Sequence, residues 1–353
     1  MKRLISFLCV LCLMALWAIP CHAAVAVLRY WVEDDQAVIT GIESPYEIAL
    51  TIPEEIEGYP VTKIGNAAFS HCTVLSEIVL PDTITVIADD AFVGCTALRS
   101  VVFSENLHTI EEDAFSDCIS LPEIALPASL KTIGNFAFSN CSNLKTVNIP
   151  EGVTSMGIGA FCECTGLTEI SLPGSLTVIE AAAFASCSGL EKVHLGEGIQ
   201  QISDTAFVSC SGLKELTIPA SVTQVGAMIV TYTGVEKIYF RGDAPSFSDD
   251  SFFQRAATAY YPAGNETWTI DVKRHYGGNI TWVEYNPLPA MGDVTGDGRI
   301  NVGDVSKLYA HVRKTAQLTG DALAVADVAR NGIINIGDVS KLYAVVKKTV
   351  SLS

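Results

Sequence analysis

Positive charge is scarce in this chain of 353 residues. It has 22 Lys and Arg against 39 Asp and Glu, which gives a formal net charge of −17 at pH 7. Residues 24–290 hold 33 of the acidic side chains and only 12 of the basic ones. Such a segment repels nucleic acid and anionic membranes. The composition therefore disfavours a nucleic-acid partner, although acidity can also serve only to keep a protein in solution.

Long apolar runs are absent after the first twenty residues. The one such run, Leu4–Ile19, follows two basic residues and precedes Pro20. This order, with small residues just after it, is typical of a secretory signal peptide, predicted here as residues 1–23. No later segment reaches the roughly 18 apolar residues that a membrane span needs. We therefore expect a secreted, extracellular protein; a lipid anchor at Cys21 is the alternative, which the preceding proline disfavours.

Cysteine pairs suited to disulfides are also lacking, although the chain has 11 cysteines. Three lie in the predicted signal peptide, and seven of the other eight share one position of a repeat. Equivalent side chains in stacked repeats point in parallel, which is poor disulfide geometry. We expect a ladder of buried thiols acting as small apolar side chains. Cys162 lies off this ladder, and the sequence does not identify a partner for it.

The chain is rich instead in a repeat of 23 residues. Phenylalanine, cysteine and leucine recur at this interval, and an alanine precedes each phenylalanine. A fixed period of this length is typical of a stacked array in which each unit buries its apolar face against its neighbours. The recurring residues include Phe69, Phe92, Phe115, Phe138, Phe161, Phe184 and Phe207 and, three residues after each, Cys72, Cys95, Cys118, Cys141, Cys164, Cys187 and Cys210.

Each unit contains a short alternation of apolar and polar residues, as in Leu75–Pro81. Ile78 and Leu80 are predicted to face inward and Glu77 and Val79 outward, because successive strand side chains point to opposite faces. A proline ends this stretch in five units, where a missing backbone donor does least harm. The Ala-Phe-x-x-Cys segment is predicted to be a short helical turn on the opposite side.

The outward strand positions are small, polar or acidic, and Tyr239 is their one aromatic residue. Sugar-binding faces usually present aromatic rings, so a long polysaccharide platform is disfavoured on this face. Protein or peptide contact is favoured, although hot-spot residues such as Trp, Tyr and Arg are rare here; a structural spacer is the alternative. The outward pairs are Glu77/Val79, Ser100/Val102, Glu123/Ala125, Thr146/Asn148, Glu169/Ser171, Lys192/His194, Glu215/Thr217 and Lys237/Tyr239.

These units resemble the BspA-like leucine-rich repeats of bacterial surface and secreted proteins, over about residues 28–285. The resemblance implies the α/β class: a right-handed solenoid of 23-residue repeats with a parallel β-sheet on its concave side. It implies protein or surface binding and no chemistry. We predict an N-terminal cap with an irregular repeat at 24–61, leucine-rich repeats at 62–241 and a C-terminal cap at 242–285.

Two segments near the C-terminal end match almost residue for residue, Asp293–Asp304 and Asp327–Asp338. Each has oxygen donors at spaced positions, a glycine in the middle and the same following residues, Val-Ser-Lys-Leu-Tyr-Ala. This spacing suits a hard cation, since alternate residues turn inward and the glycine permits a sharp bend. The predicted metal ligands are Asp293, Thr295, Asp297, the Arg299 carbonyl, Asn301, Asp304, Asp327, Asn331, the Ile333 carbonyl, Asn335 and Asp338.

The two loops differ in their donors. Thr295 of the first loop corresponds to Ala329 of the second, which has no side-chain oxygen, and the charged Asp297 corresponds to the neutral Asn331. We therefore predict two Ca²⁺ sites, of which the second binds more weakly. Neither loop is preceded by a helix of EF-hand length, and Asp replaces the Glu that usually ends such a loop.

The loop pair resembles a type I dockerin, predicted as residues 291–353 after a linker at 286–290. The likeness implies a small all-α module, calcium-dependent folding and docking onto a cohesin module of a scaffolding protein, as in cellulosomes. The contact residues it implies form two nearly identical sets, which suggests two docking orientations related by a half-turn. These sets are Val302, Gly303, Tyr309, Ala310 and Lys314, and Ile336, Gly337, Tyr343, Ala344 and Lys348.

The function indicated is that of a non-catalytic, secreted binding protein of a polysaccharide-degrading assembly. It would be attached through the dockerin to a cohesin, with an unidentified protein or cell-wall ligand on the repeats. An adhesin for a host or plant-surface protein is the alternative. A glycoside hydrolase is disfavoured, because it needs two carboxylates in a cleft and the repeats occupy nearly all of the chain before the dockerin. We predict no catalytic residue.

Overall fold

The computed structural model describes residues 5–6, 28–43, 48–285, 294, 302–314, 317–318, 326, 328 and 334–347. They belong to two compact units, one of residues 1–261 and 265–283 and the other of residues 262–264 and 284–353. Apart from Ile5–Ser6, the predicted signal peptide lies outside the described residues, as does the predicted linker. Among the helices described, none has the length and apolar character that crossing a membrane requires.

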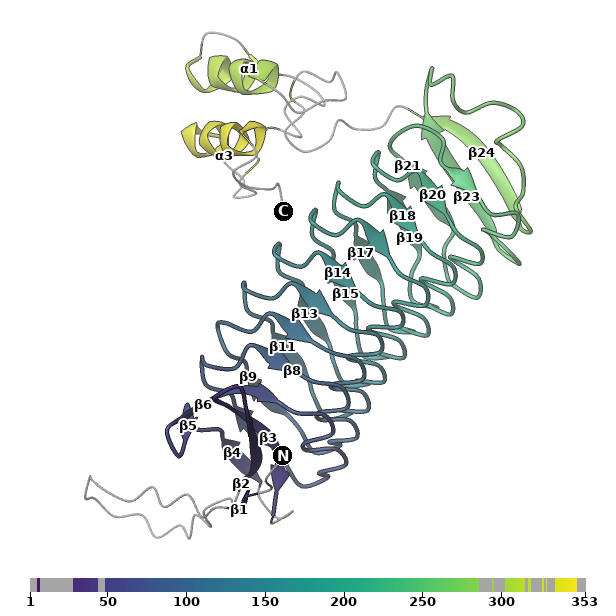
Figure 1. Ribbon diagram of the computed structural model, residues 1–353. Helices are drawn as coiled ribbons and strands as arrows, with labels where there is room; N and C mark the ends of the chain where they lie inside the picture. Colours follow the sequence, from purple (N-terminus) through teal and green to yellow (C-terminus); the bar gives the residue numbers. More distant parts are fainter. Residues whose placement is uncertain are drawn as a thin grey trace. The chain divides into compact units, whose positions relative to one another are not determined.

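The larger unit is a stack of turns that form parallel ladders of short strands (Figure 1). In the first ladder, residues one repeat apart lie opposite each other, as Glu77 does to Ser100 and Ile78 to Val101. Glu77 and Val79 are exposed and Ile78 is buried, which confirms the predicted alternation. The strands are β4 (Ala49–Thr51), β7 (Glu77–Val79), β9 (Ser100–Val102), β11 (Glu123–Ala125), β13 (Thr146–Asn148), β15 (Glu169–Ser171), β17 (Lys192–His194), β19 (Glu215–Ile218), β21 (Lys237–Phe240), β23 (Ala256–Pro262) and β24 (Asn279–Tyr285).

A second ladder, which the sequence analysis did not predict, is formed mostly by strands of two residues. Its sequence signal is the isoleucine that recurs as Ile87, Ile110 and Ile133, but two residues are too few to show an alternation. The strands are β3 (Gln36–Ile42), β6 (Tyr59–Ile64), β8 (Val86–Ile87), β10 (Thr109–Ile110), β12 (Thr132–Ile133), β14 (Ser155–Met156), β16 (Val178–Ile179), β18 (Gln201–Ile202), β20 (Gln224–Val225) and β22 (Ser246–Phe247).

Antiparallel strands cover the N-terminal end of the stack. Strand β2 (Leu28–Glu33) forms a hairpin with β3, and β1 (Ile5–Ser6) pairs with β2. Strand β5 (Glu55–Ile56) pairs antiparallel with β6. The parallel stacking therefore begins at β3, whose other edge pairs with β6.

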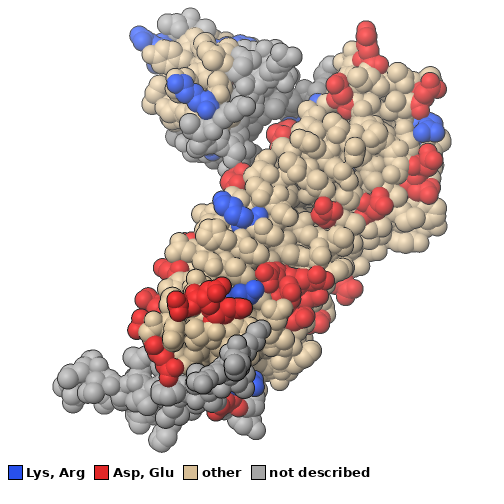
Figure 2. Space-filling view, in the orientation of Figure 1, with Lys and Arg blue, Asp and Glu red and all other residues tan. Residues whose placement is uncertain are grey.

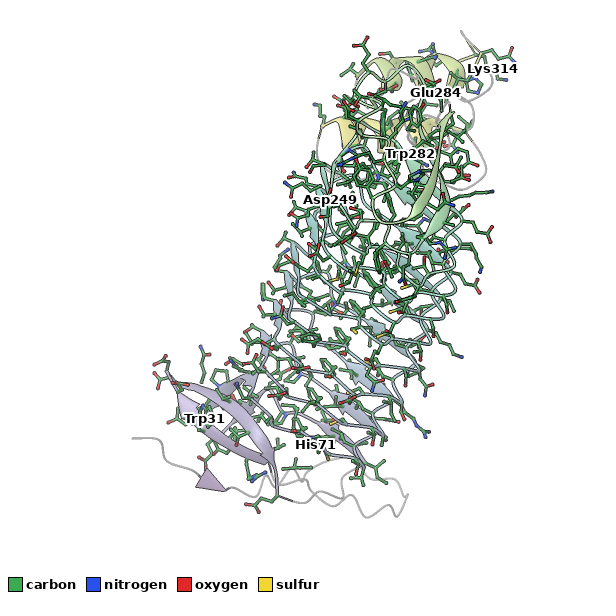
Figure 3. All side chains as sticks on the ribbon, turned by 90° about the vertical axis from the view of Figure 1, so that its right-hand side faces the viewer. Trp31, His71, Asp249, Trp282, Glu284 and Lys314 are labelled. Carbon is green, nitrogen blue, oxygen red and sulfur yellow. The ribbon has the colours of Figure 1, made fainter. Side chains whose placement is uncertain are left out.

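Side chains fill the interior of the larger unit along its length (Figure 3). The repeated phenylalanines form a continuous stack within this core. Neighbouring rings from Phe69 to Phe207 have centroids 4.9–5.9 Å apart and planes within 11° of parallel. These rings have 2% of their surface exposed or less. Each unit thus fills its core with one ring, and each ring is covered by the rings of its neighbours.

The Ala-Phe-x-x-Cys segment consists of successive turns, so the expected helical turn is not found there. Asp90 and Gly94 have positive φ angles of 58° and 69°, a conformation that does not continue a right-handed helix. Alternate N–H groups bond to the next unit instead: Asp90 donates to Glu112, Phe92 to Ala114 and Gly94 to Ser116. Bonds between neighbouring turns therefore replace the bonds within a helix.

The repeated thiols do more than fill space. The Sγ of each repeated cysteine from Cys95 to Cys210, which excludes Cys162, donates to the carbonyl oxygen of the phenylalanine one unit earlier, at 3.0–3.3 Å, as Cys141 does to Phe115. These six thiols are fully buried, and all eight cysteines between residues 72 and 210 are free. Burial raises the pKa of the Cys95 and Cys210 thiols to about 12. Burial also raises the pKa of the four repeated thiols between them, those of Cys118, Cys141, Cys164 and Cys187.

The buried thiols predict a loss of stability at alkaline pH. An ordinary thiol has a pKa of 9.0, whereas that of Cys95 rises to about 12 in the folded chain. Between these values the folded chain keeps a proton that the unfolded chain loses, so the free energy of unfolding falls as pH rises, by about 1.4 kcal/mol per pH unit for each such thiol. Urea denaturation should show a midpoint that is stable below pH 9.0 and falls steeply above it.

A variant with one thiol fewer separates this effect from the ionisation of lysine and tyrosine. Cys141→Ala should have a lower free energy of unfolding than the native chain at neutral pH. In alkali, the free energy of unfolding of this variant should fall less steeply with pH than that of the native chain. Identical slopes for the two proteins would contradict the assignment to the thiols.

Residues 242–285 continue the stack. Strand β22 pairs with β20 and β23 with β21, both in parallel. Aromatic residues cluster here, and they belong to the same core as the repeats. The centroid distances in the cluster range from 4.6 Å between Phe247 and Tyr276 to 6.3 Å between Phe247 and Trp268.

The smaller unit contains the helices α1 (Val302–Val312) and α3 (Ile336–Val346), which pack against each other. Leu308 of α1 and Leu342 of α3 are fully buried in a core of their own. Both elements described within residues 291–353 are helices, which agrees with the predicted all-α module. The other buried residues of this core are Val294, Leu318, Ala326, Val328 and Val339.

Candidate functional site

The helices α1 and α3 present matching surfaces to solvent. Val302 and Ile336, at the first position of each helix, are 61% and 56% exposed, and Tyr309 and Tyr343 are 41% and 46% exposed. Residues seven positions apart lie on the same side of a helix. Each helix therefore offers one aliphatic and one aromatic side chain on one face, which is unusual for residues outside a core and typical of a contact surface.

A cation lies beside each of these tyrosines. The Arg313 guanidinium lies 5.7 Å from the ring centroid of Tyr309, and the Lys347 ammonium lies 5.0 Å from that of Tyr343. Arg313 also donates to the Tyr309 hydroxyl at 3.2 Å. Both pairs have the i, i+4 spacing that brings helix side chains together. The sequence analysis missed Arg313 and Lys347, although this spacing is visible in the sequence.

Two carboxylates are buried at the beginnings of the helices. Asp304 and Asp338 have no exposed surface, and each lies in the first turn of its helix. The Asp338 carboxylate accepts from the Asn335 N–H at 2.7 Å, and the Asn335 side chain accepts from the Gly337 N–H at 2.7 Å. This reciprocal arrangement is a capping box. The helix dipole favours negative charge at this end, which accounts for part of the stabilisation of these carboxylates.

The buried carboxylates fit the donor set that calcium prefers. Ca²⁺ is bound by carboxylate, amide and carbonyl oxygens, and Asp304 and Asp338 are the last donors of the two predicted loops. Bound calcium would supply the positive charge near these two groups. In the residues that the structure describes, no cluster of three or more His, Cys, Asp or Glu side chains suits a metal.

Most of the predicted ligands lie outside the described residues, so the ligand set stays a prediction. Three are described: Asp304 and Asp338 are buried, and Asn335 is half-buried and caps α3. The ligands outside the described residues are Asp293, Thr295, Asp297, Arg299, Asn301, Asp327, Asn331 and Ile333.

The predicted cohesin-contact residues are described except for Lys348. Ala310 and Ala344 are half-buried, and the other seven are exposed. The structure therefore leaves both sets accessible at equivalent positions of the two helices. Their role in docking stays a prediction. The exposed residues are Val302, Gly303, Tyr309, Lys314, Ile336, Gly337 and Tyr343.

The outward side chains of the first ladder form a surface of the larger unit, which we call the sheet face. His194 lies 3.0 Å from the Glu169 carboxylate on the neighbouring strand. The rings of Tyr239 and Tyr260 stack with centroids 4.7 Å apart. The sequence analysis missed Tyr260, because it did not predict that β23 continues the ladder in register with β21. Tyr239 is therefore half of an aromatic pair at the C-terminal end of the sheet face.

Acidic side chains gather over the N-terminal half of the stack (Figure 2). Four acidic residues on the turns of adjacent units, Asp90, Glu112, Asp113 and Asp117, interact electrostatically. Partial burial raises the pKa of the Asp113 carboxyl, a hydrogen bond from Ser116 lowers it, and the charges of Asp90, Glu112 and Asp117 raise it further. Carboxylates therefore repel one another on this surface, which is unsuited to a polyanion such as nucleic acid.

Comparison with protein families decides the classification. Six copies of the BspA type leucine-rich repeat region match residues 62–187 and 143–258, which together are more than half of the chain. The chain belongs to the BspA-type leucine-rich repeat family. Residues 291–346 match the dockerin type I domain, so this family member carries a dockerin at its C-terminal end. Both are non-catalytic types of module, and no enzymatic domain is found in addition.

Solved structures support the same fold. A leucine-rich repeat protein of T. pallidum is 32% identical, with a TM-score of 0.50 over 53% of this chain and 87% of that one. A leucine-rich repeat protein from Bacteroides ovatus is 24% identical, with a TM-score of 0.50 over 73% of this chain and 75% of that one. Among curated proteins, none matches this chain.

Proposed function

We propose that this protein is a secreted, non-catalytic component of a cellulosome-type assembly. Its dockerin attaches the chain to a cohesin module of a scaffolding protein, and its leucine-rich repeats bind a protein or surface ligand. The matching exposed faces of α1 and α3, each beside a buried carboxylate, are the observation that carries this proposal. A contact surface needs exposed anchors held by a rigid support, and the packed pair of helices supplies both.

Binding of the full chain to purified cohesins tests the attachment. Biolayer interferometry in calcium should detect a complex with at least one type I cohesin. The full chain is used for this measurement, so no truncated protein is required. If no cohesin of a broad panel binds the calcium-loaded chain, the attachment is wrong.

The likeness of the two helices predicts two interchangeable docking orientations. A double substitution on one helix, Val302→Asp with Tyr309→Ala, should leave cohesin affinity within about threefold of the native value, because the face of α3 remains. The matched pair on α3, Ile336→Asp with Tyr343→Ala, should behave in the same way. The four substitutions together should abolish binding.

Complete loss of affinity from either double substitution alone would contradict the two orientations. The circular dichroism of each variant is compared with that of the native chain as a control for folding. All four positions are exposed, so these substitutions should preserve the helices.

A further inference from the structure

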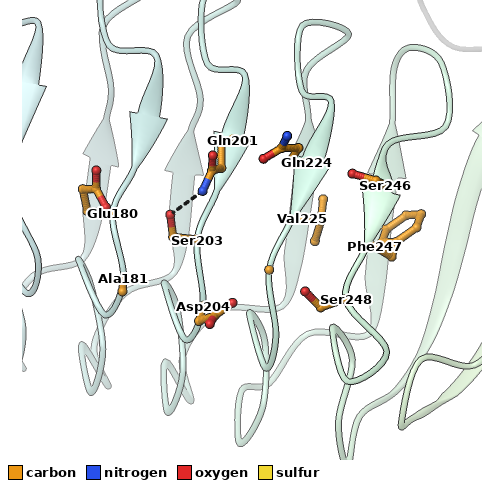
Figure 4. A pocket seen from close by; sticks show the side chains of 11 residues that line it. Glu180, Ala181, Gln201, Ser203, Asp204, Gln224, Val225, Ser246, Phe247 and Ser248 are labelled. Carbon is orange, nitrogen blue, oxygen red and sulfur yellow. Dashed lines mark hydrogen bonds between the residues drawn. The ribbon is translucent and has the colours of Figure 1, made fainter.

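A polar groove crosses the second ladder at strands β16, β18, β20 and β22 (Figure 4). Its volume is about 470 Å³. Gln201 and Gln224 lie opposite each other on β18 and β20. The equivalent residues on β8, β10, β12, β14 and β16 are shorter, namely Val86, Thr109, Thr132, Ser155 and Val178. Two adjacent amide side chains therefore distinguish this end of the ladder from the rest.

Gly226 lies in the floor of the groove, where the neighbouring turn packs closely against it. A Cβ at this position would lie 2.5 Å from the Oδ1 of Asp204 and 2.6 Å from its backbone nitrogen. No side chain fits there without a shift of the neighbouring turn. Ser203 and Ser248 occupy the equivalent position on the two adjacent turns (Figure 4). The floor between the Ser203 and Ser248 hydroxyl groups therefore carries no side chain.

Several polar groups of the groove are held in place by hydrogen bonds. The Gln201 amide donates to the Ser203 hydroxyl at 3.1 Å, and Asp204 Oδ1 accepts from the Ala227 N–H at 2.7 Å. The Gln224 amide and the Glu180 carboxylate make no side-chain hydrogen bond to any residue that the structure describes. Two hydrogen-bonding groups therefore remain for a ligand, next to others that are already oriented.

The charge of the groove limits the class of ligand. Its lining contains two carboxylates, Glu180 and Asp204, and no Lys, Arg or His. Phosphates and other anions are therefore repelled. Carboxylates accept from hydroxyl groups, and a glutamine amide both donates to and accepts from them. At one end the partly buried Phe247 ring packs against Phe252 and Tyr276 of the core, so the groove offers a ligand mainly hydrogen-bonding groups.

We propose that this groove binds a short, neutral oligosaccharide. Parallel strands are about 4.8 Å apart, so the four strands span about 14 Å, which is longer than one sugar ring. Each strand adds polar groups at nearly the same height, so the groove offers similar contacts to successive sugar units. The groove lies on the second ladder and is distinct from the sheet face, which belongs to the first ladder. The inference rests on the proposed function in one respect: it names the ligand of the repeats.

Isothermal titration of the full calcium-loaded chain tests the proposal. The probes are cellohexaose, xylohexaose, mannohexaose and maltohexaose, with tetragalacturonic acid as an anionic probe and hexalysine as a cationic one. We expect at least one neutral probe to bind and the anionic probe not to bind. Gln224→Ala should weaken that binding about tenfold, equivalent to about 1.4 kcal/mol, because the free amide is lost.

Thr132→Ala is the matched control, since Thr132 has the equivalent position on β12 outside the groove. It should leave the affinity of the neutral probe unchanged. Absence of binding by all four neutral probes, equal effects of the two variants, or binding of hexalysine alone would each overturn the proposal. Cohesin binding is measured on the same samples. The proposal of oligosaccharide binding and the proposal of attachment to a cohesin can therefore fail independently of each other.

Discussion

Removal of calcium is expected to unfold the C-terminal module and to abolish binding of the chain to cohesin. Asp304 and Asp338 are fully buried at the beginnings of α1 and α3. An uncompensated buried carboxylate costs several kcal/mol, on the order of the whole stability of a small module. Metal binding supplies folding free energy in modules of this size. The free energy of unfolding should therefore fall to about zero when calcium is chelated.

The measurement is the helical circular dichroism signal of the full chain, followed with cohesin affinity as EDTA is added. The larger unit contributes strand signal and no described helix, so it should remain unchanged. Asp304→Asn should weaken calcium binding at the first predicted site, and Asp338→Asn at the second. A calcium titration should show two unequal affinities. Retention of helicity and of cohesin binding in excess EDTA would contradict the prediction.

Truncation of one ring in the middle of the phenylalanine stack is expected to have the largest effect on the repeats. The ring centroid of Phe138 lies 5.3 Å from the ring centroids of both Phe115 and Phe161. Phe138→Ala removes its apolar burial and leaves a cavity between two units, at a cost of about 3–5 kcal/mol. In a stacked array the coupling between neighbours carries much of the stability. A cavity at one position should therefore weaken both adjacent interfaces.

Urea denaturation followed by circular dichroism measures this effect. Thr146→Ala is the control, because Thr146 lies in the same unit as Phe138 but on the exposed sheet face. Substitutions at such positions change stability by about 0.5 kcal/mol or less. The midpoint should fall strongly for Phe138→Ala and barely for Thr146→Ala. Equal midpoints for the two variants would show that the ring stack does not stabilise the array.

Much of the fold was predictable because each core position recurs in every repeat of the sequence. Seven phenylalanines and seven cysteines in register identify one core position each, and the strand alternation of Glu77, Ile78 and Val79 identifies its faces. The predicted helical turn was wrong because hydrogen bonds from Asp90 and Phe92 go to the next unit. A pattern within one unit contains no information about a bond between two units.

The smaller unit shows a similar division. The spacing of the paired loops of residues 293–304 and 327–338 predicts two cation sites, and the family match confirms the resemblance of this pair to a type I dockerin. The cations beside Tyr309 and Tyr343 were missed, although they occur at helix spacing. The buried state of Asp304 and Asp338 could not be read from the loops, since it depends on the packing of α1 against α3.

The sequence by itself determined the repeat, its core residues, its outward strand residues and the two-part organisation of the chain, because periodic spacing is a one-dimensional property. Only the tertiary structure decided that a second ladder exists, that the thiols donate to the carbonyl of the previous unit, and that Tyr260 stacks on Tyr239. Each of these joins residues of different turns. Their geometry arises from how closely one turn lies on the next, which no single unit encodes.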